Sequence, residues 1–405
     1  MTKTCIIVGG SHAGSQLAVS LRQSGWDGEI LLVGDEPHLP YHRPPLSKEF
    51  LAGRKTLDDI LIRAPVAYEK ASVRLLTGRR AETIDRKEKR VMLDDGQSIA
   101  YDKLALAVGS RVRRMNAPGV ELKGVHYLRN VADVEAIRPG ARGGGHAVII
   151  GGGYIGLETA AVLRQSGMNV TVVEMLERVM QRVTAPQVSA FYARVHTEEG
   201  VKILCNTGVK AFEGSGHVAS VVCSDGRKLP ADLVIIGIGI VPNVELAQAA
   251  GLDVDNGIVV DEFTRTSDPD IHAAGDCTNH YNRVYDRRVR LESVQNATDQ
   301  ARAAALAICG KGQPYDALPW FWSDQYDLKL QIAGLSQGHD EVVLRGDANS
   351  GRSLAAFYLK EGTVIAVDAV NKPQEFMAGK KLITEKKVVD RNRLADPAVP
   401  MRELA

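Results

Sequence analysis

Residues 146–174 read HAVIIGGGYIGLETAAVLRQSGMNVTVVE, and this stretch decides the fold. An apolar strand runs into a glycine turn at Gly151, Gly153 and Gly156, which is followed by an amphipathic helix and a second strand ending at Glu174. In such a βαβ unit the three glycines serve the tight turn, the approach of backbone to a pyrophosphate, and helix–strand packing. The stretch therefore predicts a dinucleotide site, with Glu174 spaced for a ribose contact.

A related unit opens the chain, where TCIIVGGSHAGSQLAVSLRQSG is followed by EILLVGDE. Gly9 and Gly14 fill the outer places of its turn, and Ser11 replaces the middle glycine. Asp35 and Glu36 end the next strand and offer a carboxylate to a ribose diol. Taken alone, this first turn is equally compatible with a plain structural turn.

Two such units predict two dinucleotides, because each helix N-terminus offers unpaired N–H groups and a positive dipole end to one pyrophosphate. A flavin with a nicotinamide is the commoner pairing. Two nicotinamide sites, as in a transhydrogenase, are the less common alternative.

Length, charge and cysteine content indicate which broad classes of protein fit this chain. The 405 residues favour two or three domains, and 50 basic against 49 acidic residues give no global charge for nucleic acid or membrane binding. No apolar run reaches membrane-span length, and a first strand at Cys5–Val8 leaves no room for a signal peptide. Five scattered cysteines without a C-x-x-C pair favour a reduced, cytoplasmic protein.

Further motifs follow in order: PYHRPPLSKEFLAG at 40–53, ALAVGS at 105–110, TSDPDIHAAGDC at 266–277, LESVQNATDQARAAA at 291–305 and PWFWSDQYDLKLQIAG at 319–334. With the two turns, they make the whole chain resemble the NADH-dependent ferredoxin reductases of bacterial oxygenase systems. These are flavoproteins of the glutathione reductase fold. The resemblance implies an α/β fold with two Rossmann-like dinucleotide-binding domains and a C-terminal α+β domain.

The resemblance also implies the cofactors FAD and NADH and the residues that hold them. The expected FAD contacts are Gly9, Ser11, Ala13, Gly14, Asp35, Glu36, Lys48, Ala81, Arg129, Asp276, Val294 and Trp322. The expected NAD contacts are Gly151, Gly153, Tyr154, Ile155, Gly156, Glu158, Glu174 and Arg182. Lys48 and Glu158 are the candidate catalytic pair, which would orient the carboxamide and place a cation near flavin N5.

Cofactor choice is argued from Glu174, whose carboxylate suits an NADH ribose and would repel the 2′-phosphate of NADPH. Arg178 and Arg182 leave the alternative open, because an arginine at this place could pair with the 2′-phosphate of NADPH. The helix pattern over Val294–Ile308, with Ser293 as its N-cap, is either an ordinary surface helix or one that directs its positive end at the flavin. Trp320 is either a core aromatic or a flavin contact.

The expected domains are a first FAD segment at 1–110, an NAD domain at 111–240, a second FAD segment at 241–317 and an interface or docking domain at 318–405. The discontinuous FAD domain is required because the GDC motif and the helix after Ser293 must meet the first turn. From about 318, short alternating apolar runs predict an antiparallel sheet backed by one or two helices.

Disulfide reductases of this fold carry redox cysteines near the flavin, and the corresponding stretch PHLPYHRPPLSKEF has none. No histidine has metal-ligand spacing, so no metal site is expected. The expected electron acceptor is a [2Fe–2S] ferredoxin or a rubredoxin; a redox-controlled binding protein like apoptosis-inducing factor is the alternative from another class. No nucleic acid or membrane partner is expected, and the chain is expected to be a monomer or weak homodimer.

Clusters of basic residues are candidates for attracting an acidic ferredoxin by charge complementarity. The candidates are Arg283, Arg287, Arg288 and Arg290, then Lys380, Lys381, Lys386 and Lys387, and the single residues Arg63 and Arg302.

Overall fold

The computed structural model of the protein describes residues 3–405. The chain forms two compact units, each assembled from three segments. The first unit contains residues 3–42, Leu57–Arg111 and Val241–Pro319; the second contains Arg43–Thr56, Val112–Ile240 and Trp320–Ala405. The expected division into four domain segments stays a prediction. In the structure, residues 43–56 belong to the second unit.

The first unit is built on a five-stranded parallel sheet with the order β19-β7-β1-β2-β3. Its strands are β1 (Thr4–Val8), β2 (Glu29–Gly34), β3 (Val73–Thr77), β7 (Lys103–Leu106) and β19 (Ile271–Ala273). The central strand β1 reads TCIIV and is almost wholly buried, as expected for a parallel strand covered on both faces.

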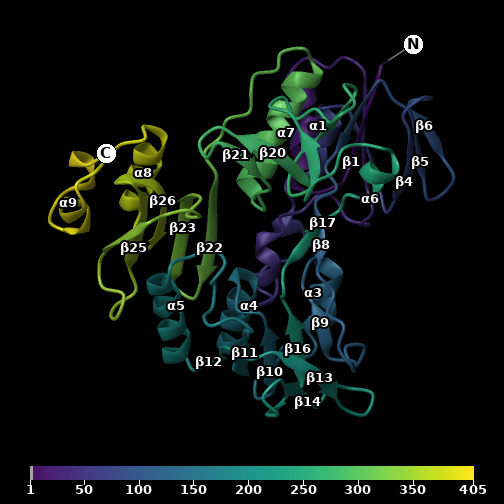
Figure 1. The fold of residues 1–405 in the computed structure, drawn as a ribbon. Coiled ribbons are helices and arrows are strands. Elements are labelled where there is room, and N and C mark those ends of the chain that lie inside the picture. Colours follow the sequence, from purple (N-terminus) through teal and green to yellow (C-terminus); the bar gives the residue numbers. More distant parts are fainter. Residues whose placement is uncertain (1–2) are drawn as a thin grey trace. The chain divides into compact units, whose positions relative to one another are not determined.

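Two helices lie side by side in this unit, α1 (His12–Gln23) and α7 (Val294–Ile308) (Figure 1). Leu17 and Leu21 of α1 share one apolar core with the alanines of α7, which include Ala301 and Ala305. Small side chains on α7 permit this close packing. The predicted helix over Val294–Ile308 is confirmed, and Ser293 is its N-cap, with Oγ accepting the Asn296 N–H at 3.0 Å.

The remaining elements of the first unit surround this framework. An antiparallel sheet contains β4 (Ala81–Asp85), β5 (Arg90–Leu93) and β6 (Ser98–Ala100). A second small sheet contains β18 (Ile258–Val260), β20 (Thr278–Asn282) and β21 (Arg287–Val289). The short helices are η2 (Asp58–Ile60), α2 (Pro65–Lys70) and α6 (Glu245–Ala249). The strands β8 (Ser110–Val112) and β17 (Ile240–Pro242) each contain residues of both units.

The second unit repeats the design with a parallel sheet of order β12-β11-β10-β16-β9. Its strands are β9 (Val125–Tyr127), β10 (His146–Ile150), β11 (Asn169–Val173), β12 (Lys202–Leu204) and β16 (Leu233–Ile236). The helices are η1 (Pro44–Ser47), α3 (Val131–Ile137), α4 (Tyr154–Gln165) and α5 (Pro186–Glu198), and an antiparallel sheet contains β13 (Val209–Glu213), β14 (Ser220–Cys223) and β15 (Lys228–Pro230). The two parallel sheets confirm the predicted pair of Rossmann-like units.

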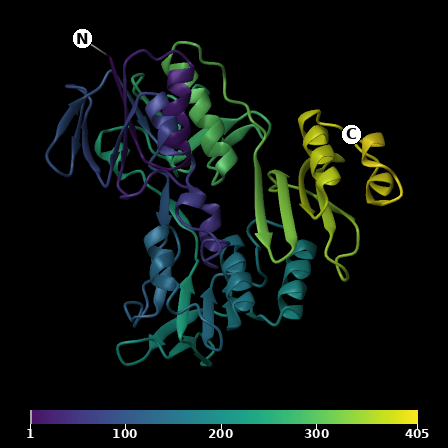
Figure 2. The ribbon, with the colours of Figure 1, turned by 180° about the vertical axis from the view of Figure 1, so that it is seen from behind.

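The last part of the second unit is an antiparallel sheet of order β22-β23-β26-β25-β24, seen from behind in Figure 2. Its strands are β22 (Trp320–Gln325), β23 (Leu328–Gly334), β24 (Glu341–Arg345), β25 (Leu354–Lys360) and β26 (Thr363–Val370). The helix α8 (Pro373–Thr384) packs on β23 and β26, and α9 (Arg391–Ala395) and η3 (Met401–Glu403) follow it. The predicted antiparallel sheet with helices is confirmed.

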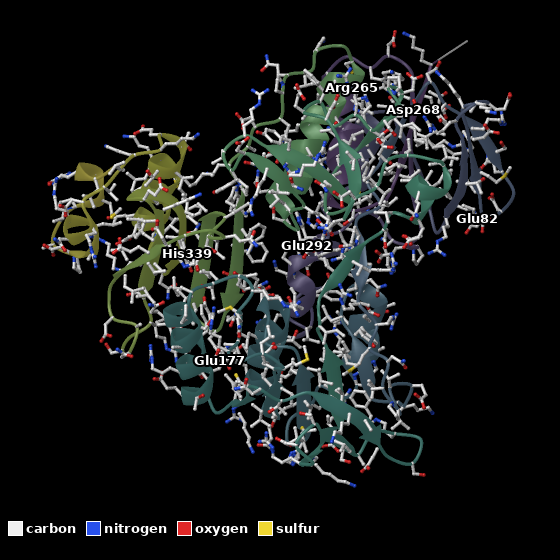
Figure 3. All side chains as sticks on the ribbon, in the orientation of Figure 1. Glu82, Glu177, Arg265, Asp268, Glu292 and His339 are labelled. Carbon is white, nitrogen blue, oxygen red and sulfur yellow. The ribbon has the colours of Figure 1, made fainter. Side chains whose placement is uncertain are left out.

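Charged and polar side chains cover each unit, with Arg265 and Asp268 on the first and Glu177 and His339 on the second (Figure 3). Among residues 3–405, no helix has the length and apolar character needed to cross a membrane. All five cysteines are free thiols.

Candidate functional site

The second glycine turn, Gly151–Gly156, joins β10 to α4 and forms a tight cradle. Gly151 has φ +105°, and a Cβ there would lie 2.4 Å from the Gly237 carbonyl oxygen. A Cβ on Gly156 would lie 2.0 Å from the Gly151 oxygen. Gly153 is the N-cap of α4. A Cβ added at this glycine would have no non-neighbouring atom of the described chain within 4 Å. This open side, next to the unpaired N–H groups of the first helical turn, fits a pyrophosphate.

Glu174 follows β11 and is fixed against this cradle. Its Oε2 accepts the Gly152 N–H at 2.7 Å, and its Oε1 accepts the Leu176 N–H at 2.8 Å. A carboxylate has about four lone-pair sites, so two remain for the hydroxyls of a ribose. The residues present therefore fit a nicotinamide dinucleotide.

Among the other expected NAD contacts, Tyr154 and Ile155 belong to the same turn, whereas Arg182 lies after β11. Tyr154 begins α4, and its ring lies 4.9 Å from the Phe321 ring. Ile155 is exposed, as is Arg182. Arg178 already donates to groups within the chain, so Arg182 is the better placed of the two arginines to meet a ligand.

The first glycine turn, Gly9–Gly14, has the same geometry. Gly9 has φ +119°, and a Cβ there would lie 2.1 Å from the Ala107 oxygen. A Cβ on Gly14 would lie 1.9 Å from the Gly9 oxygen. Ser11 is the extended N-cap of α1, so the serine occupies the place of the middle glycine without disturbing the turn. This cradle fits the pyrophosphate of FAD.

Three segments of the first unit meet around Gly275. A Cβ on this glycine, which has φ +92°, would lie 3.2 Å from Cβ of Ala13 and 3.7 Å from Cβ of Ala297. The neighbouring Asp276 accepts a hydrogen bond from Ser110 at 3.1 Å. The first glycine turn, the GDC motif and the first turn of α7, through Ala297, are thus brought together, as a single flavin site requires.

The remaining expected FAD contacts occupy both units. Asp35 is exposed after β2, and Glu36 accepts a hydrogen bond from Tyr41. Ala81 begins β4 in the first unit. Arg129, in the second unit, precedes α3 and accepts a hydrogen bond from Arg43 through its carbonyl oxygen at 2.8 Å.

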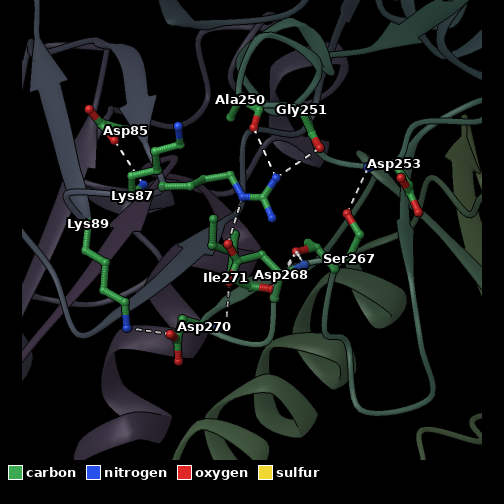
Figure 4. A network of polar contacts seen from close by, with 12 residues as sticks. Asp85, Lys87, Lys89, Ala250, Gly251, Asp253, Ser267, Asp268, Asp270 and Ile271 are labelled. Carbon is green, nitrogen blue, oxygen red and sulfur yellow. Dashed lines mark hydrogen bonds and ion pairs between the residues drawn. The ribbon is translucent and has the colours of Figure 1, made fainter.

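A charged network anchors the segment that leads to the GDC motif (Figure 4). Arg86 Nε donates to Asp268 at 2.8 Å, while Asp270 pairs with Lys89 at 2.5 Å and with Lys103 at 2.6 Å. The two lysines lower the pKa of Asp270 by hydrogen bonding. The network holds the loop before β19 in place. It thereby also fixes the chain segment that leads to Asp276.

The structure brings the candidate catalytic residues Lys48 and Glu158 together within the second unit. Lys48 Nζ lies 2.7 Å from Glu158 Oε2, and the two side chains are only 12% and 2% exposed. Ser47 donates to Oε2 at 2.6 Å, and Ser323 donates to Oε1 at 2.6 Å. A buried carboxylate requires such compensation, so this is a structured ion pair and not a solvated surface contact.

Sequence reasoning missed both serines. Ser47 adjoins Lys48 in the PPLSK motif, which was a usable signal. Ser323 lies 165 residues from Glu158, and no local pattern indicates that contact.

Trp322 lies on β22 beside Trp320, with ring centroids 5.5 Å apart. Lys380 Nζ lies 5.9 Å from the Trp320 ring. The two strands β22 and β23 border an open cavity of about 340 Å³. Its lining residues are Trp320, Trp322, Asp324, Lys329, Leu330 and Gln331. An aromatic wall of this kind suits a flat ring system.

The five cysteines are free thiols, and Cys277 is buried. The 3-10 helix η1 and Lys48 occupy the stretch where disulfide reductases carry cysteines. Burial raises the pKa of Cys277 to about 12, which keeps that thiol protonated and inert. Residues 3–405 contain no group of histidine, cysteine and carboxylate side chains suited to a metal ion.

Two phosphate cradles on two Rossmann-like units define a two-dinucleotide oxidoreductase. The chain belongs to the pyridine nucleotide-disulphide oxidoreductase family, whose profile matches residues 3–301, and a reductase C-terminal profile matches residues 320–405. Enzymes of this class use FAD and NADH.

Within the family, the chain is 47% identical to putidaredoxin reductase of Pseudomonas putida over 98% of this chain and 96% of that protein. It is 45% identical to the ferredoxin reductase subunit of a 5,5′-dehydrodivanillate O-demethylase of Sphingobium sp., over 99% and 98%. The crystal structure of a covalent putidaredoxin reductase–putidaredoxin complex matches with a TM-score of 0.96 and 46% identity, covering 99% and 97% of the chains. The glutathione reductase-like fold is thereby confirmed.

Proposed function

We propose that this protein is an NADH-dependent ferredoxin reductase that supplies a cytochrome monooxygenase or a ring-hydroxylating dioxygenase. When bound, FAD would supply the chemistry of hydride acceptance from NADH and of single-electron release. The observation that carries the proposal is the Lys48–Glu158 pair beside the second glycine turn, in a chain that lacks cysteines at the position of the redox dithiol. Relatives that match over nearly the whole chain are reductases of ferredoxin partners.

The second glycine turn and Glu174 select and hold the nucleotide. The N-terminus of α4 offers N–H groups to the pyrophosphate, and Glu174 offers its remaining lone pairs to the ribose hydroxyls. A 2′-phosphate at this place would meet a carboxylate, so NADH is preferred over NADPH.

Lys48 and Glu158 orient the reacting end of the nucleotide. The ion pair fixes both side chains, so the lysine ammonium group is held in one position beside a buried carboxylate. Held in this way, the pair supplies an oriented donor and acceptor without reorganisation during the reaction. In the first unit, the first turn of α7 places Ala297 beside Gly275, and the positive end of this helix stabilises negative charge at the flavin site.

Basic side chains of each unit provide candidate docking surfaces for an acidic iron–sulfur protein. Lys386 and Lys387 are exposed after α8, whereas Arg302 pairs with Asp299 and Arg63 donates to Ser15. The exposed lysines are therefore better candidates than Arg63 and Arg302. Which cluster docks the partner stays a prediction.

We infer a cytoplasmic location from the five free thiols, since oxidising compartments favour disulfides. A monomer or weak homodimer stays a prediction.

The test is to purify the yellow protein and to measure cytochrome c reduction with NADH or NADPH, with and without candidate [2Fe–2S] ferredoxins and rubredoxins. We expect NADH to be preferred and a [2Fe–2S] ferredoxin to accelerate the reaction. If no iron–sulfur protein accelerates it, the partner is wrong; if a rubredoxin alone does so, the acceptor is a rubredoxin.

A further inference from the structure

A line of buried hydrogen bonds runs from Glu158 to α5 within the second unit. Ser323 donates to Glu158 Oε1 at 2.6 Å, and Gln325 Nε2 lies 3.2 Å from Ser323 Oγ. Gln325 Oε1 lies 2.8 Å from His196 Nε2, and the Tyr326 hydroxyl lies 3.4 Å from His196 Nδ1. Ser323, Gln325 and His196 are each at most 1% exposed.

The chemistry of these groups fixes the direction of every bond in the line. A carboxylate only accepts, so Ser323 must give its single proton to Glu158. The Ser323 oxygen is then the acceptor for the amide N–H₂ of Gln325, which turns the Gln325 oxygen toward His196. That oxygen in turn requires a proton on His196 Nε2, leaving Nδ1 to accept from Tyr326.

The state of His196 agrees with this direction. Burial lowers the pKa of His196 to about 4, so the ring is neutral at neutral pH and carries one N–H. That N–H is used at Nε2 by the hydrogen bond to Gln325. No other tautomer satisfies both contacts.

We infer that Ser323, Gln325 and His196 are positioning residues for the reaction, which hold the Glu158 carboxylate in the orientation that pairs with Lys48. Lys48 and Ser47 both bind Oε2, and only Ser323 binds Oε1 among the hydrogen bonds of the described residues. Without the Ser323 bond, the carboxylate is held through Oε2 alone, and Oε1 has no donor to fix the plane of the group. The inference rests on the proposed function, because Glu158 must act on bound NADH for its orientation to matter.

The line orients Glu158 and does not conduct protons. The amide of Gln325 has no proton to pass on without changing its tautomer. The expected signature is therefore a slower reaction at unchanged nucleotide affinity, because the glycine turn and Glu174 are untouched.

The experiment compares the rate of flavin reduction at saturating NADH in anaerobic stopped flow, together with the Kd for NADH and the flavin content. We expect Ser323→Ala to slow flavin reduction about tenfold, which corresponds to about 1.4 kcal/mol. Gln325→Glu replaces the donor by an acceptor of the same shape and draws the Ser323 proton away, so a similar loss is expected. The Kd for NADH should stay within about twofold of wild type, as for any change confined to the reacting geometry.

His196 supplies the test that separates positioning from packing. His196→Leu removes the N–H and should slow flavin reduction, while His196→Gln places an amide N–H at the same reach and should restore the rate to within about twofold. The matched control is Thr159→Val, which removes a buried hydroxyl next to Glu158 that donates to the Ile155 carbonyl oxygen of the same helix at 2.7 Å. This control should leave the rate within about twofold of wild type.

The inference is overturned if Ser323→Ala and Gln325→Glu both reduce flavin at the wild-type rate with normal flavin content. It is also overturned if His196→Gln is as slow as His196→Leu, or if Thr159→Val is as slow as Ser323→Ala. If wild-type flavin is not reduced by NADH at all, the proposed function itself is wrong, which is a different result. Chemically reduced variants should still pass electrons to the ferredoxin at the wild-type rate.

Discussion

At the scale of single residues, Glu174 is the proposed link between the glycine turn and the nucleotide. Glu174→Ala removes the acceptor for the Gly152 and Leu176 N–H groups and the carboxylate proposed to bind the ribose hydroxyls. The loss of hydrogen bonds to a charged group predicts a KM for NADH that rises about tenfold or more. Flavin content should not change, because the first glycine turn is intact. Loss of flavin with normal NADH affinity would show that the two nucleotide sites have been exchanged.

Lys48 provides the positive charge opposite the Glu158 carboxylate, which is almost completely buried. Lys48→Met leaves Glu158 with two serine donors and no opposite charge. Removing one partner of a buried pair typically costs about 3–5 kcal/mol, so Tm should fall, and flavin reduction by NADH should slow strongly. Thermal melts and stopped flow on the same preparation check both expectations. A variant with unchanged Tm and rate would contradict the buried pair.

At the scale of elements, the β10–α4 turn allows two glycines to be compared. Gly153→Ala meets no atom of the chain and should keep the wild-type Tm, yet its methyl group enters the open side of the cradle and should weaken NADH binding. Gly156→Ala places a Cβ 2.0 Å from the Gly151 oxygen and should lower Tm as well. Melting curves and NADH titrations distinguish the two outcomes. Wild-type NADH affinity in Gly153→Ala would place the pyrophosphate elsewhere.

The same elements show what a sequence can reveal. Both glycine turns, the N-cap at Ser293 and the helix Val294–Ile308 depend on local rules of spacing and capping, and the structure contains them as predicted. The contacts of Glu158 with Ser323, and of His196 with Gln325, join residues more than a hundred positions apart. Such contacts depend on how β22 packs beside α4 and how α5 approaches β22, which no local pattern encodes.

At the scale of the whole molecule, a buried carboxylate makes the free energy of unfolding depend on pH. Asp368 on β26 accepts hydrogen bonds from Thr184 and Tyr358 and faces Tyr154 and Tyr192. His339, labelled in Figure 3, lies against Tyr358 with ring centroids 5.1 Å apart. Burial raises the pKa of Asp368 to about 6, despite these donors and the opposing effect of His339.

The folded protein therefore binds the Asp368 proton more tightly than the unfolded chain, whose pKa for this group is about 3.9. The stabilising contribution is complete below about pH 4 and is lost as pH rises through about 6. Asp368→Asn should remove this part of the pH dependence, which is measured by comparing Tm of the variant and of wild type between pH 4.5 and about 7.5. Parallel Tm profiles for the two proteins would contradict the raised pKa.

Two bound nucleotides are expected to convert one hydride into two single-electron transfers. The most direct measurement is an anaerobic titration of the flavin-loaded protein with NADH in the presence of excess oxidised [2Fe–2S] ferredoxin, followed by the flavin and iron–sulfur absorbance. The account predicts two ferredoxins reduced per NADH, since hydride carries two electrons and each cluster accepts one. A protein that takes up no flavin, or that consumes NADH without reducing the ferredoxin, would contradict it.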